Sequence, residues 1–296
     1  MYYSEAIKAL YQIWLAVVNG LNKLIDSLSA GLDICLEHVV EEIRYDDNKV
    51  SVTCSVKGQQ KAVFVAECVL STLPLGVLKR SVKNKSRAPL FIPPLPVSKV
   101  DAIDAVGFGN VNKVILVFEK AFWGSTHAFG HAVNPLIDTG FRGEYFMFQA
   151  HENVPVLTVL VSGMAAEFVE NTPAQKYISK IMAFLKAVFG EECPAQPKDI
   201  IITRWRSDCF SQGSYSYIPP GCSPVLYDTL SAPVKDSSGF DRIFFAGEHT
   251  CREQPASLHG AYMSGLREAG HIANRLIGIP YSSNLTNSDG TSDVCI

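Results

Sequence analysis

The segment Arg242–Gly278 constrains the fold of this chain more than any other feature. It opens with a short apolar run, Ile243–Ala246, which a glycine ends, as expected of a buried parallel strand. A stretch with helical periodicity follows from about Leu258 to Leu276. Glycine inside a helix costs about 1 kcal/mol relative to alanine. Gly260 and Gly265 therefore indicate that a large group approaches this helix, although close packing of helix on sheet is the alternative.

Further motifs precede this segment along the chain. They are Leu70–Lys79 (LSTLPLGVLK), Gly107–Lys113 (GFGNVNK), and Arg204–Arg206 (RWR) followed by Gly213–Tyr217 (GSYSY). Together with the C-terminal segment they resemble the flavin-dependent amine oxidases, in that family's order. The amino-acid sequences of these motifs are most similar to those of the lysine-specific histone demethylase branch. The resemblance extends over residues 19–278, nearly the whole chain.

The resemblance implies a fold of the α/β and α+β classes, the FAD-dependent amine oxidase fold. In this fold an incomplete Rossmann-like FAD domain is interleaved with a mixed-sheet substrate domain. Residues 19–108 and 224–280 would form the FAD-binding domain, and residues 109–223 the substrate-binding domain. Such interleaving would place the active site at the domain interface. Residues 281–296, rich in Ser, Asn, Asp, Gly and Thr, are expected to form a disordered tail.

One hallmark of the family is absent from the sequence. The G-x-G-x-x-G fingerprint that binds the adenine dinucleotide of FAD does not occur in the 296 residues. Gly107-Phe108-Gly109 is the nearest fragment, but Asn112 stands where the third glycine would be. We therefore expect the chain to correspond to the C-terminal portion of a larger amine oxidase. The family's helical tower, which docks a corepressor, would lie upstream of residue 1.

Hydrophobic periodicity predicts the remaining elements. Helices are predicted at 21–30 and 175–189, and strands at 34–36, 41–45, 50–56, 62–65, 68–72, 111–118 and 155–162. On the second helix, the predicted buried side consists of Tyr177, Ile181, Phe184, Leu185 and Val188. The proline-rich stretch 89–96 is interpreted as a connector rather than regular structure.

Charge and cysteine spacing narrow the functional classes. The net charge is −3, with 26 basic and 29 acidic residues, so direct DNA binding is not expected. The eight cysteines form no C-x-x-C pair, which argues against a zinc site and favours free thiols. The apolar run Leu10–Val18 is shorter than the about 20 residues that span a bilayer. A helix or divergent start is favoured over a signal-peptide core, and no membrane partner is expected.

Lys113 is the first catalytic candidate. In the predicted strand it shares an alternating face with Val111, Ile115 and Val117. A lysine on such a face either reaches water or is buried and functional. Burial would lower its pKa and make it available for proton chemistry. In the amine oxidases that the chain resembles, the lysine of this motif holds a water near the reactive flavin nitrogen, and Lys113 occupies that position.

The resemblance makes Tyr215 the second catalytic candidate, because in the family this residue forms a wall of the aromatic slot that guides the amine to the flavin. Such a ring attracts a methylated ammonium by about 0.5–2 kcal/mol. The further substrate-binding candidates are Phe210, Gln149 and Ser257. The demethylase branch usually has Trp at the first two positions, so Gln149 leaves the substrate preference open. Judged on residue types alone, the aromatic cluster around Trp205 could equally be core.

The resemblance also implies a set of cofactor contacts, with no metal site. These are Val40, Thr72, Leu73, Pro74, Trp205, Glu248, Ala256, Ser257 and Leu258. Glu248 directly follows the apolar strand and its glycine, where an open α/β sheet presents groups to its ligand. Without the resemblance it would be an ordinary turn acid. His249 and His259 are interpreted as structural.

The implied activity is FAD-dependent oxidation of a substituted amine. Removal of a hydride, or its equivalent, from the carbon beside nitrogen gives an imine that water hydrolyses, and the reduced flavin passes electrons to dioxygen to form hydrogen peroxide. On a methylated lysine of a histone tail the other product is formaldehyde, and the expected location is the nucleus. Two alternatives stay open. One is a polyamine or small-amine oxidase, and the other is a truncated, non-catalytic fragment that acts as an interaction module.

Overall fold

The computed structural model describes residues 20–46, 48–58, 60–85, 88–130, 147–151 and 154–278. Two compact units divide the chain, Met1–His38 and Val39–Ile296. In the first unit, helix α2 (Asn22–Ser29) confirms the predicted helix and has no buried residue. The predicted strand at 34–36 is wrong, because these residues are exposed and form no ladder within the described chain. The apolar run 10–18 and the expected disordered tail 281–296 lie outside the described residues.

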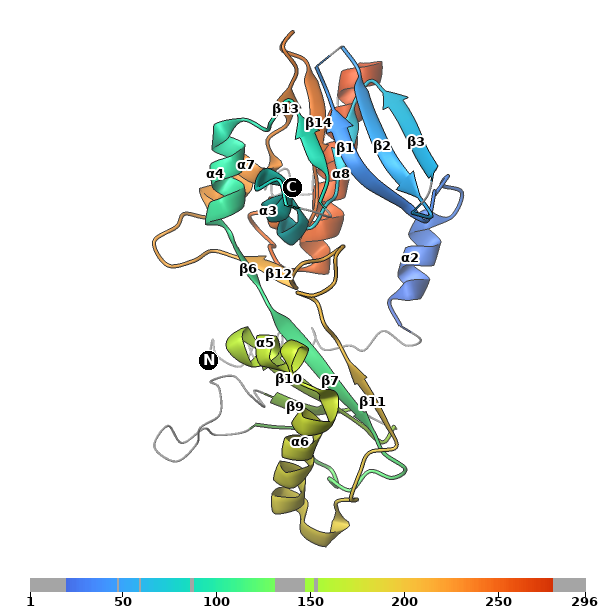
Figure 1. The fold of residues 1–296 in the computed structure, drawn as a ribbon, viewed down its shortest axis with the longest axis vertical. Helices are drawn as coiled ribbons and strands as arrows, with labels where there is room; N and C mark the ends of the chain where they lie inside the picture. Colours follow the sequence, from blue (N-terminus) through green and yellow to red (C-terminus); the bar gives the residue numbers. More distant parts are fainter. Residues whose placement is uncertain are drawn as a thin grey trace, which may run out of the picture. The chain divides into compact units, whose positions relative to one another are not determined.

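The first sheet of the second unit has the strand order β3-β2-β1-β5 (Figure 1). Its strands are β1 (His38–Arg44), β2 (Val50–Val56), β3 (Gln60–Ala66) and β5 (Leu90–Ile92). β2 and β3 pair antiparallel with Val50 opposite Ala66, across a turn in which Lys57 and Gly58 both have positive φ. The connector predicted at 89–96 is wrong in its first half, because parallel pairing with β1 makes residues 90–92 a strand.

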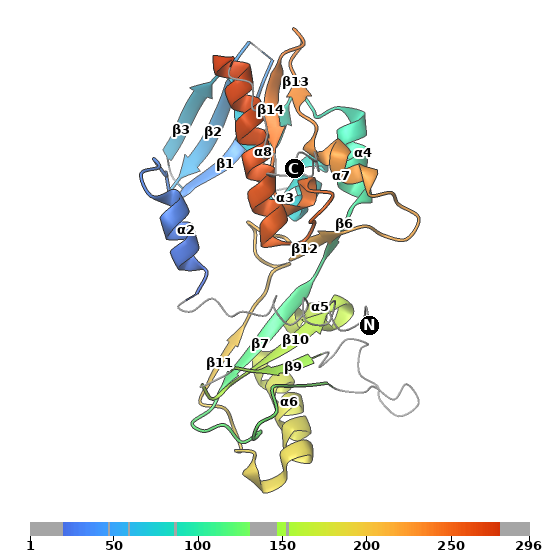
Figure 2. The ribbon, with the colours of Figure 1, turned by 180° about the vertical axis from the view of Figure 1, so that it is seen from behind.

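A second sheet, of order β13-β14-β4, carries the C-terminal segment. Its strands are β4 (Val69–Ser71), β13 (Val234–Lys235) and β14 (Asp241–Phe245). β14 is buried and pairs in parallel with β4, Ile243 opposite Val69, which confirms the predicted buried parallel strand. The 3-10 turn η2 (Glu248–Thr250) and helix α8 (Leu258–Ile277) follow, and α8 runs beside β14 in both views (Figures 1 and 2).

Three shorter helices belong to the same part of the fold. They are α3 (Leu75–Val82), α4 (Val97–Ala105) and α7 (Val225–Ser231). None of them was predicted. Each starts directly after a proline, at Pro74, Pro96 and Pro224, whose ring fixes φ near a helical value. These prolines therefore begin helices where the sequence pattern indicated only the end of an extended segment.

The largest sheet has five strands in the order β11-β7-β10-β9-β8. Its strands are β7 (Val111–Val117), β8 (Ala128–Phe129), β9 (Met147–Ala150), β10 (Val156–Ser162) and β11 (Asp199–Ile202). β7 lies between β11 and β10 and is antiparallel to both. Helices α5 (Gly163–Asn171) and α6 (Ala174–Phe189) and the 3-10 turn η1 (Gly190–Glu192) follow β10.

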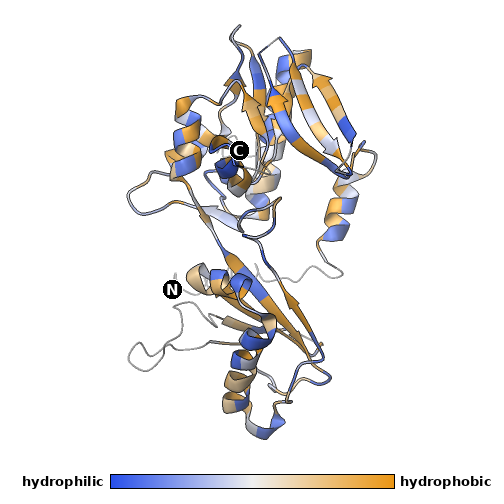
Figure 3. Ribbon diagram, in the orientation of Figure 1, coloured by the Kyte–Doolittle hydropathy of each residue, from blue (hydrophilic) through white to orange (hydrophobic). Residues whose placement is uncertain are grey.

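Two hydrophobic clusters underlie these sheets. One contains residues between 114 and 202, and the other contains residues of 40–108 and 218–245. The clusters separate near the predicted domain limits, which themselves stay a prediction. Along α6, apolar and polar residues alternate in bands (Figure 3), and Tyr177, Ile181 and Leu185 are buried as predicted. Val188 is exposed instead, because it lies in the last turn of the helix. None of the described helices has the length and apolar character to cross a membrane.

Candidate functional site

A short two-stranded pair joins two of the sequence motifs. β6 (Gly107–Gly109) pairs antiparallel with β12 (Tyr215–Tyr217), with Tyr215 opposite Gly109 and Tyr217 opposite Gly107. The ring of Tyr217 lies over Gly107, where an added Cβ would come within 2.4 Å of the ring atom Cζ. Glycine is therefore required at 107 for the aromatic strand to pack this closely.

The loop before β12 closes on itself through backbone hydrogen bonds. The Gly213 amide donates to the Trp205 carbonyl at 2.9 Å, and the Gln212 amide donates to the Asp208 carbonyl at 2.9 Å. Gly213 has φ +142, and a Cβ there would lie 2.4 Å from Cδ1 of Phe108. Both the backbone angle and the space exclude a larger residue. The loop thus brings Trp205 beside Phe108 of β6.

A hollow of about 210 Å³ lies at the meeting point of these segments. Its lining residues are Thr72, Pro74, Phe108, Trp205, Ser211, Gly213, Ser214, Gly247, Glu248 and His249. All four motifs singled out in the sequence contribute to this lining, although they are up to 177 positions apart (72 to 249). A larger hollow of about 660 Å³ is lined by residues between 119 and 155 and contains none of the predicted site residues.

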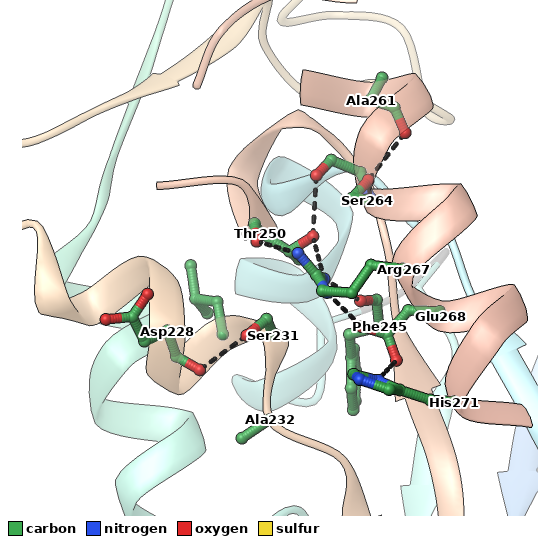
Figure 4. A network of polar contacts seen from close by, with 12 residues as sticks. Asp228, Ser231, Ala232, Phe245, Thr250, Ala261, Ser264, Arg267, Glu268 and His271 are labelled. Atoms are coloured by element: carbon green, nitrogen blue, oxygen red, sulfur yellow. Dashed lines mark hydrogen bonds and ion pairs between the residues drawn. The ribbon is translucent and has the colours of Figure 1, made fainter. Parts of the chain in front are cut away.

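Helix α8 holds the turn that supplies Gly247, Glu248 and His249. The Gly247 amide donates to Oγ of Ser264 at 2.9 Å. The guanidinium of Arg267 donates to the carbonyls of Thr250, at 2.9 Å, and Phe245, at 3.2 Å (Figure 4). Because Ser264 is fully buried, these bonds fix the turn to the helix in a low-dielectric setting where each counts for more than in water.

Glu248 connects three segments of the site. Its Oε1 accepts from the Ser216 amide at 3.1 Å, and its Oε2 accepts from Ser216 Oγ at 2.6 Å and from the Ala256 amide at 2.8 Å. Ser216 Oγ also bonds to the hydroxyl of Tyr227, whose pKa is raised by burial. The carboxylate is therefore already bound by the chain itself on both oxygens.

Two basic residues, His249 at the hollow and Lys99 of α4, are buried and influence one another electrostatically. Burial, with a smaller contribution from the charge of Lys99, lowers the pKa of His249 to about 4. The imidazole Nε2 has no hydrogen-bond partner among the described residues. Lys99 donates to the carbonyls of Leu230, at 2.8 Å, and Ala232, and its Nζ lies 4.1 Å from the ring centroid of Phe245. Burial lowers the pKa of Lys99 to about 7.

Lys113 lies on the exposed face of β7. The opposite face, with Asn112, Val114 and Leu116, is fully buried against the helices that cover the sheet. The buried alternative for Lys113 is therefore wrong in the described structure, because the core lies on the other side of the strand. The Lys113 amide donates to Oγ1 of Thr203 at 2.8 Å, and its catalytic role stays a prediction.

The structure gathers part of the predicted set at the hollow. Of the predicted site residues, Thr72, Pro74, Trp205 and Glu248 line it. Leu73 lies between two lining residues, and Tyr215 precedes the Ser216 that Glu248 binds. The predicted residues that do not line it are Val40, Leu73, Lys113, Gln149, Phe210, Tyr215, Ala256, Ser257 and Leu258. Val40 is on β1, in the four-stranded sheet, and Gln149 is on β9, in the five-stranded sheet that also contains β7.

The start of α8 explains one of its glycines. Ser257 is the N-cap, and its Oγ accepts from the Gly260 amide at 3.0 Å and donates to the Gln254 carbonyl at 2.7 Å. A Cβ at Gly260 would lie 2.0 Å from that carbonyl oxygen. The large group inferred from the sequence is thus the chain's own backbone at Gly260. At Gly265, apart from the neighbouring backbone of the helix itself, no heavy atom of the described residues lies within 4 Å of an added Cβ.

Sequence reasoning missed several residues of the site. His249 was interpreted as structural, yet it lines the hollow with an unpartnered nitrogen. Its position directly after Glu248, at the end of a buried strand, was the signal available. Lys99 carried no comparable signal, because it lies in a helix whose sequence does not reveal which polar residue points inward.

Comparison with known proteins supplies the class to which this arrangement belongs. Residues 6–273 match the family model described as flavin containing amine oxidoreductase. The chain belongs to this family. Membership makes the protein part of an oxidoreductase family whose cofactor is FAD.

Curated relatives of this amine oxidoreductase chain share one kind of name. The chain is 44% identical to the possible lysine-specific histone demethylase 1 of Drosophila melanogaster, over 89% of this chain and 31% of that protein. It is 41% identical to the lysine-specific histone demethylase 1 homolog 2 of Arabidopsis thaliana, over 86% of this chain and 33% of that protein. The chain therefore spans about a third of the length of the curated relatives it matches.

The lining of the hollow fits part of a flavin. Trp205 and Phe108 offer aromatic surfaces for a planar ring, and the buried Nε2 of His249 is a polar atom without a hydrogen-bond partner among the described residues. Pockets that bind drug-sized ligands hold about 300–1,000 Å³, so a hollow of about 210 Å³ has room for a portion of FAD but not for the whole dinucleotide.

Proposed function

We propose that this chain provides part of the flavin and amine site of an FAD-dependent oxidase that demethylates a methylated lysine on a histone tail. The observation that carries the proposal is the hollow in which the four amine-oxidase motifs meet. The names of the relatives support the substrate class.

In this proposal, FAD when bound supplies the two-electron oxidation of the carbon–nitrogen bond, and water hydrolyses the resulting imine to formaldehyde and the demethylated amine. The chain's own residues bind and orient. Trp205 and Phe108 stack on a planar group, and the buried imidazole of His249 is neutral at pH 7 and places no positive charge beside it.

Exposed aromatic rings of residues 204–217 are the proposed route for the amine. Trp205, Phe210 and Tyr215 are all exposed, and all three belong to one loop and the strand that follows it. Aromatic faces attract a methylated ammonium, which makes them suited to guide a protonated mono- or dimethylated amine. Lys113 keeps its proposed role in flavin chemistry through the motif resemblance alone.

Partners and location are part of the same proposal. A methylated histone tail is the proposed peptide partner, and a corepressor would bind through sequence that this chain does not contain. The nucleus is the proposed compartment because the relatives are named as histone demethylases. The alternative of a non-catalytic interaction module is favoured by one observation, the lack of the dinucleotide fingerprint in the sequence.

Product analysis tests the substrate class. The purified chain, supplied with FAD, would be incubated with a dimethyl-lysine peptide or with a polyamine, and both peroxide and formaldehyde measured. Lysine demethylation gives peroxide and formaldehyde in equal amounts, whereas oxidation of a polyamine gives peroxide without formaldehyde. Trp205→Ala should lower both products, while Lys176→Gln, on the exposed side of α6, should lower neither. Absence of both products with every amine would favour the interaction module.

A further inference from the structure

Residues 204–217, called the aromatic segment from here on, carry the rings of Trp205, Phe210 and Tyr215. These side chains are 43%, 61% and 39% exposed, so packing of the rings themselves does not hold them in place. Their positions therefore depend on how the backbone of the segment is anchored. Two carboxylates provide that anchorage, one near each end.

Glu170, in the last turn of α5, anchors the first end. Its Oε1 accepts from the Arg206 amide at 3.1 Å, and its Oε2 accepts from the Ser207 amide at 2.8 Å and from Ser207 Oγ. Asn112 and Asn110 also donate to Oε1, from Nδ2 at 2.7 and 3.0 Å. Glu170 thus ties the beginning of the segment to the start of β7.

Glu248, in η2, anchors the second end in the same manner. Like Ser207, Ser216 donates both its amide and its hydroxyl to one carboxylate. The third donor is the Ala256 amide, in the turn that leads to α8. Ala256 has φ +57, so this turn holds a backbone conformation that a non-glycine residue seldom adopts and that the Glu248 bond helps to retain.

Only an ionised carboxylate satisfies all the neighbours of Glu170. Every group around Glu170 is a donor, and an ionised carboxylate has about four acceptor sites and no donor. A glutamine would turn one acceptor oxygen into an NH₂ group that faces other donors. Hydrogen bonds to a charged acceptor are also about twice as strong as neutral ones.

We propose that Glu170 and Glu248 are positioning residues that clamp the two ends of the aromatic segment and so hold its exposed rings in place for an amine. The identity of the bound group rests on the proposed function. The clamps themselves are a statement about the backbone of this chain and do not depend on it.

The ionisation of Glu170 agrees with this arrangement. Burial raises its pKa, but the hydrogen bonds from Ser207, Asn112, Asn110 and the Arg206 amide lower it more, so the pKa lies below its ordinary value of 4.5. The carboxylate is consequently charged at neutral pH, and the first clamp should open only as the pH falls below that ordinary value.

Amide hydrogen exchange on the full chain, resolved by residue, tests the clamps in Glu170→Gln and Glu248→Gln. In Glu170→Gln, exchange at Arg206 and Ser207 should rise about tenfold while Ser216 stays unchanged. In Glu248→Gln, exchange should rise at Ser216 and Ala256 and stay unchanged at Arg206. Glu167→Gln is the matched control, since Glu167 is one turn earlier on α5 and contacts Arg206 only through its side chain, Oε1 to Nε at 3.5 Å.

A pH series separates positioning from general stabilisation. In the wild type, protection at Arg206 and Ser207 should be lost as the pH falls below 4.5, and this step should be absent in Glu170→Gln. Equal loss of protection throughout the chain, or none at these amides, would overturn the proposal. If Glu170→Gln does not fold, Ser207→Ala keeps the carboxylate and removes one donor, and it must raise exchange at residues 206 and 207 alone.

The link to the amine has its own readout. With FAD and a dimethyl-lysine peptide, each glutamine variant should raise KM by about tenfold more than it lowers kcat, because the rings that receive the amine are displaced. Exchange that changes as described while kcat and KM do not would retain the clamps but overturn their role in holding the amine. A chain with no oxidase activity would refute the proposed function and leave the exchange result standing.

Discussion

The imidazole of His249 is removed from water and lies within the electrostatic influence of Lys99, and both effects disfavour its protonated form. Its pKa is about 4 in the folded chain and about 6.5 when exposed. Between these values the unfolded chain binds a proton at this residue that the folded chain does not. The free energy of unfolding should therefore fall as the pH drops from 6.5 to 4, by at most about 3 kcal/mol from this residue.

Urea unfolding at a series of pH values tests this expectation. In His249→Gln the decrease between pH 6.5 and pH 4 should be smaller than in the wild type, since no proton can bind at that position. His127→Gln, which changes an exposed histidine, should leave the decrease as it is. An unchanged pH dependence in His249→Gln would show that the imidazole is not buried as described.

Two of the glycines of α8, Gly260 and Gly265, should respond in opposite ways to alanine. Gly260→Ala places a Cβ against the Gln254 carbonyl, and the backbone must shift, so we expect a loss of about 1–3 kcal/mol. In Gly265→Ala the added Cβ contacts no heavy atom of the described residues outside the helix's own nearby backbone, and alanine has the higher helix propensity. We therefore expect the free energy of unfolding to rise by about 0.5–1 kcal/mol. Thermal unfolding of both variants measures this, and a destabilised Gly265→Ala would mean that a neighbour does approach the helix there.

Substitution of Lys113 should affect the reaction of the flavin but not the stability of the fold. Because its side chain is exposed, Lys113→Met should change the free energy of unfolding by less than about 0.5 kcal/mol. If the role implied by the family holds, flavin reduction or reoxidation should slow by about 10²-fold. Stopped-flow absorbance measures both half-reactions, and unchanged rates would remove Lys113 from the mechanism.

At the scale of an element, strand β7 has one face that should matter for stability and one that should matter less. One face packs into the core of the sheet and the other is half-buried or exposed, so neighbouring residues differ in what they contribute. Leu116→Ala should cost about 2–5 kcal/mol, because it leaves a cavity in a fully buried cluster. Ile115→Ala, one position away, should cost clearly less. Similar costs at both positions would contradict the assignment of faces.

Elements with strong local patterns could be predicted from the sequence. Strands β2, β7, β10 and β14 and helix α6 are where the hydrophobic pattern placed them, because one face of each, or both, packs into a core. Helix α8 is also where it was predicted, and its buried residues are small or polar: Gly260, Ser264, Glu268 and Gly270. β5 was missed because its pairing partner β1 is 48 positions away (Ile43 opposite Phe91), and long-range pairing overrides a local proline-rich composition.

The candidate site was predictable only in part. Motif resemblance found Thr72, Pro74, Trp205 and Glu248, which line one hollow. It did not find Glu170, because a glutamate near the end of an amphipathic helix is ordinarily solvated. Its burial among donors arises from the meeting of α5, β7 and the aromatic segment, which no local pattern encodes.

At the scale of the whole molecule, the chain is a family member that covers about a third of its curated relatives. It contains the hollow where the amine-oxidase motifs meet, but its sequence has no G-x-G-x-x-G fingerprint for the dinucleotide. The central claim is that this hollow, built by the chain alone, receives the flavin.

The visible absorption spectrum of the purified chain, mixed with FAD and then freed of unbound FAD by gel filtration, tests that claim most directly. We expect a protein-bound flavin band shifted from that of free FAD, and a weaker band for Trp205→Ala than for Lys176→Gln. A folded chain that emerges without flavin, with circular dichroism matching its helices and strands, would contradict the claim and leave flavin binding to residues beyond this hollow.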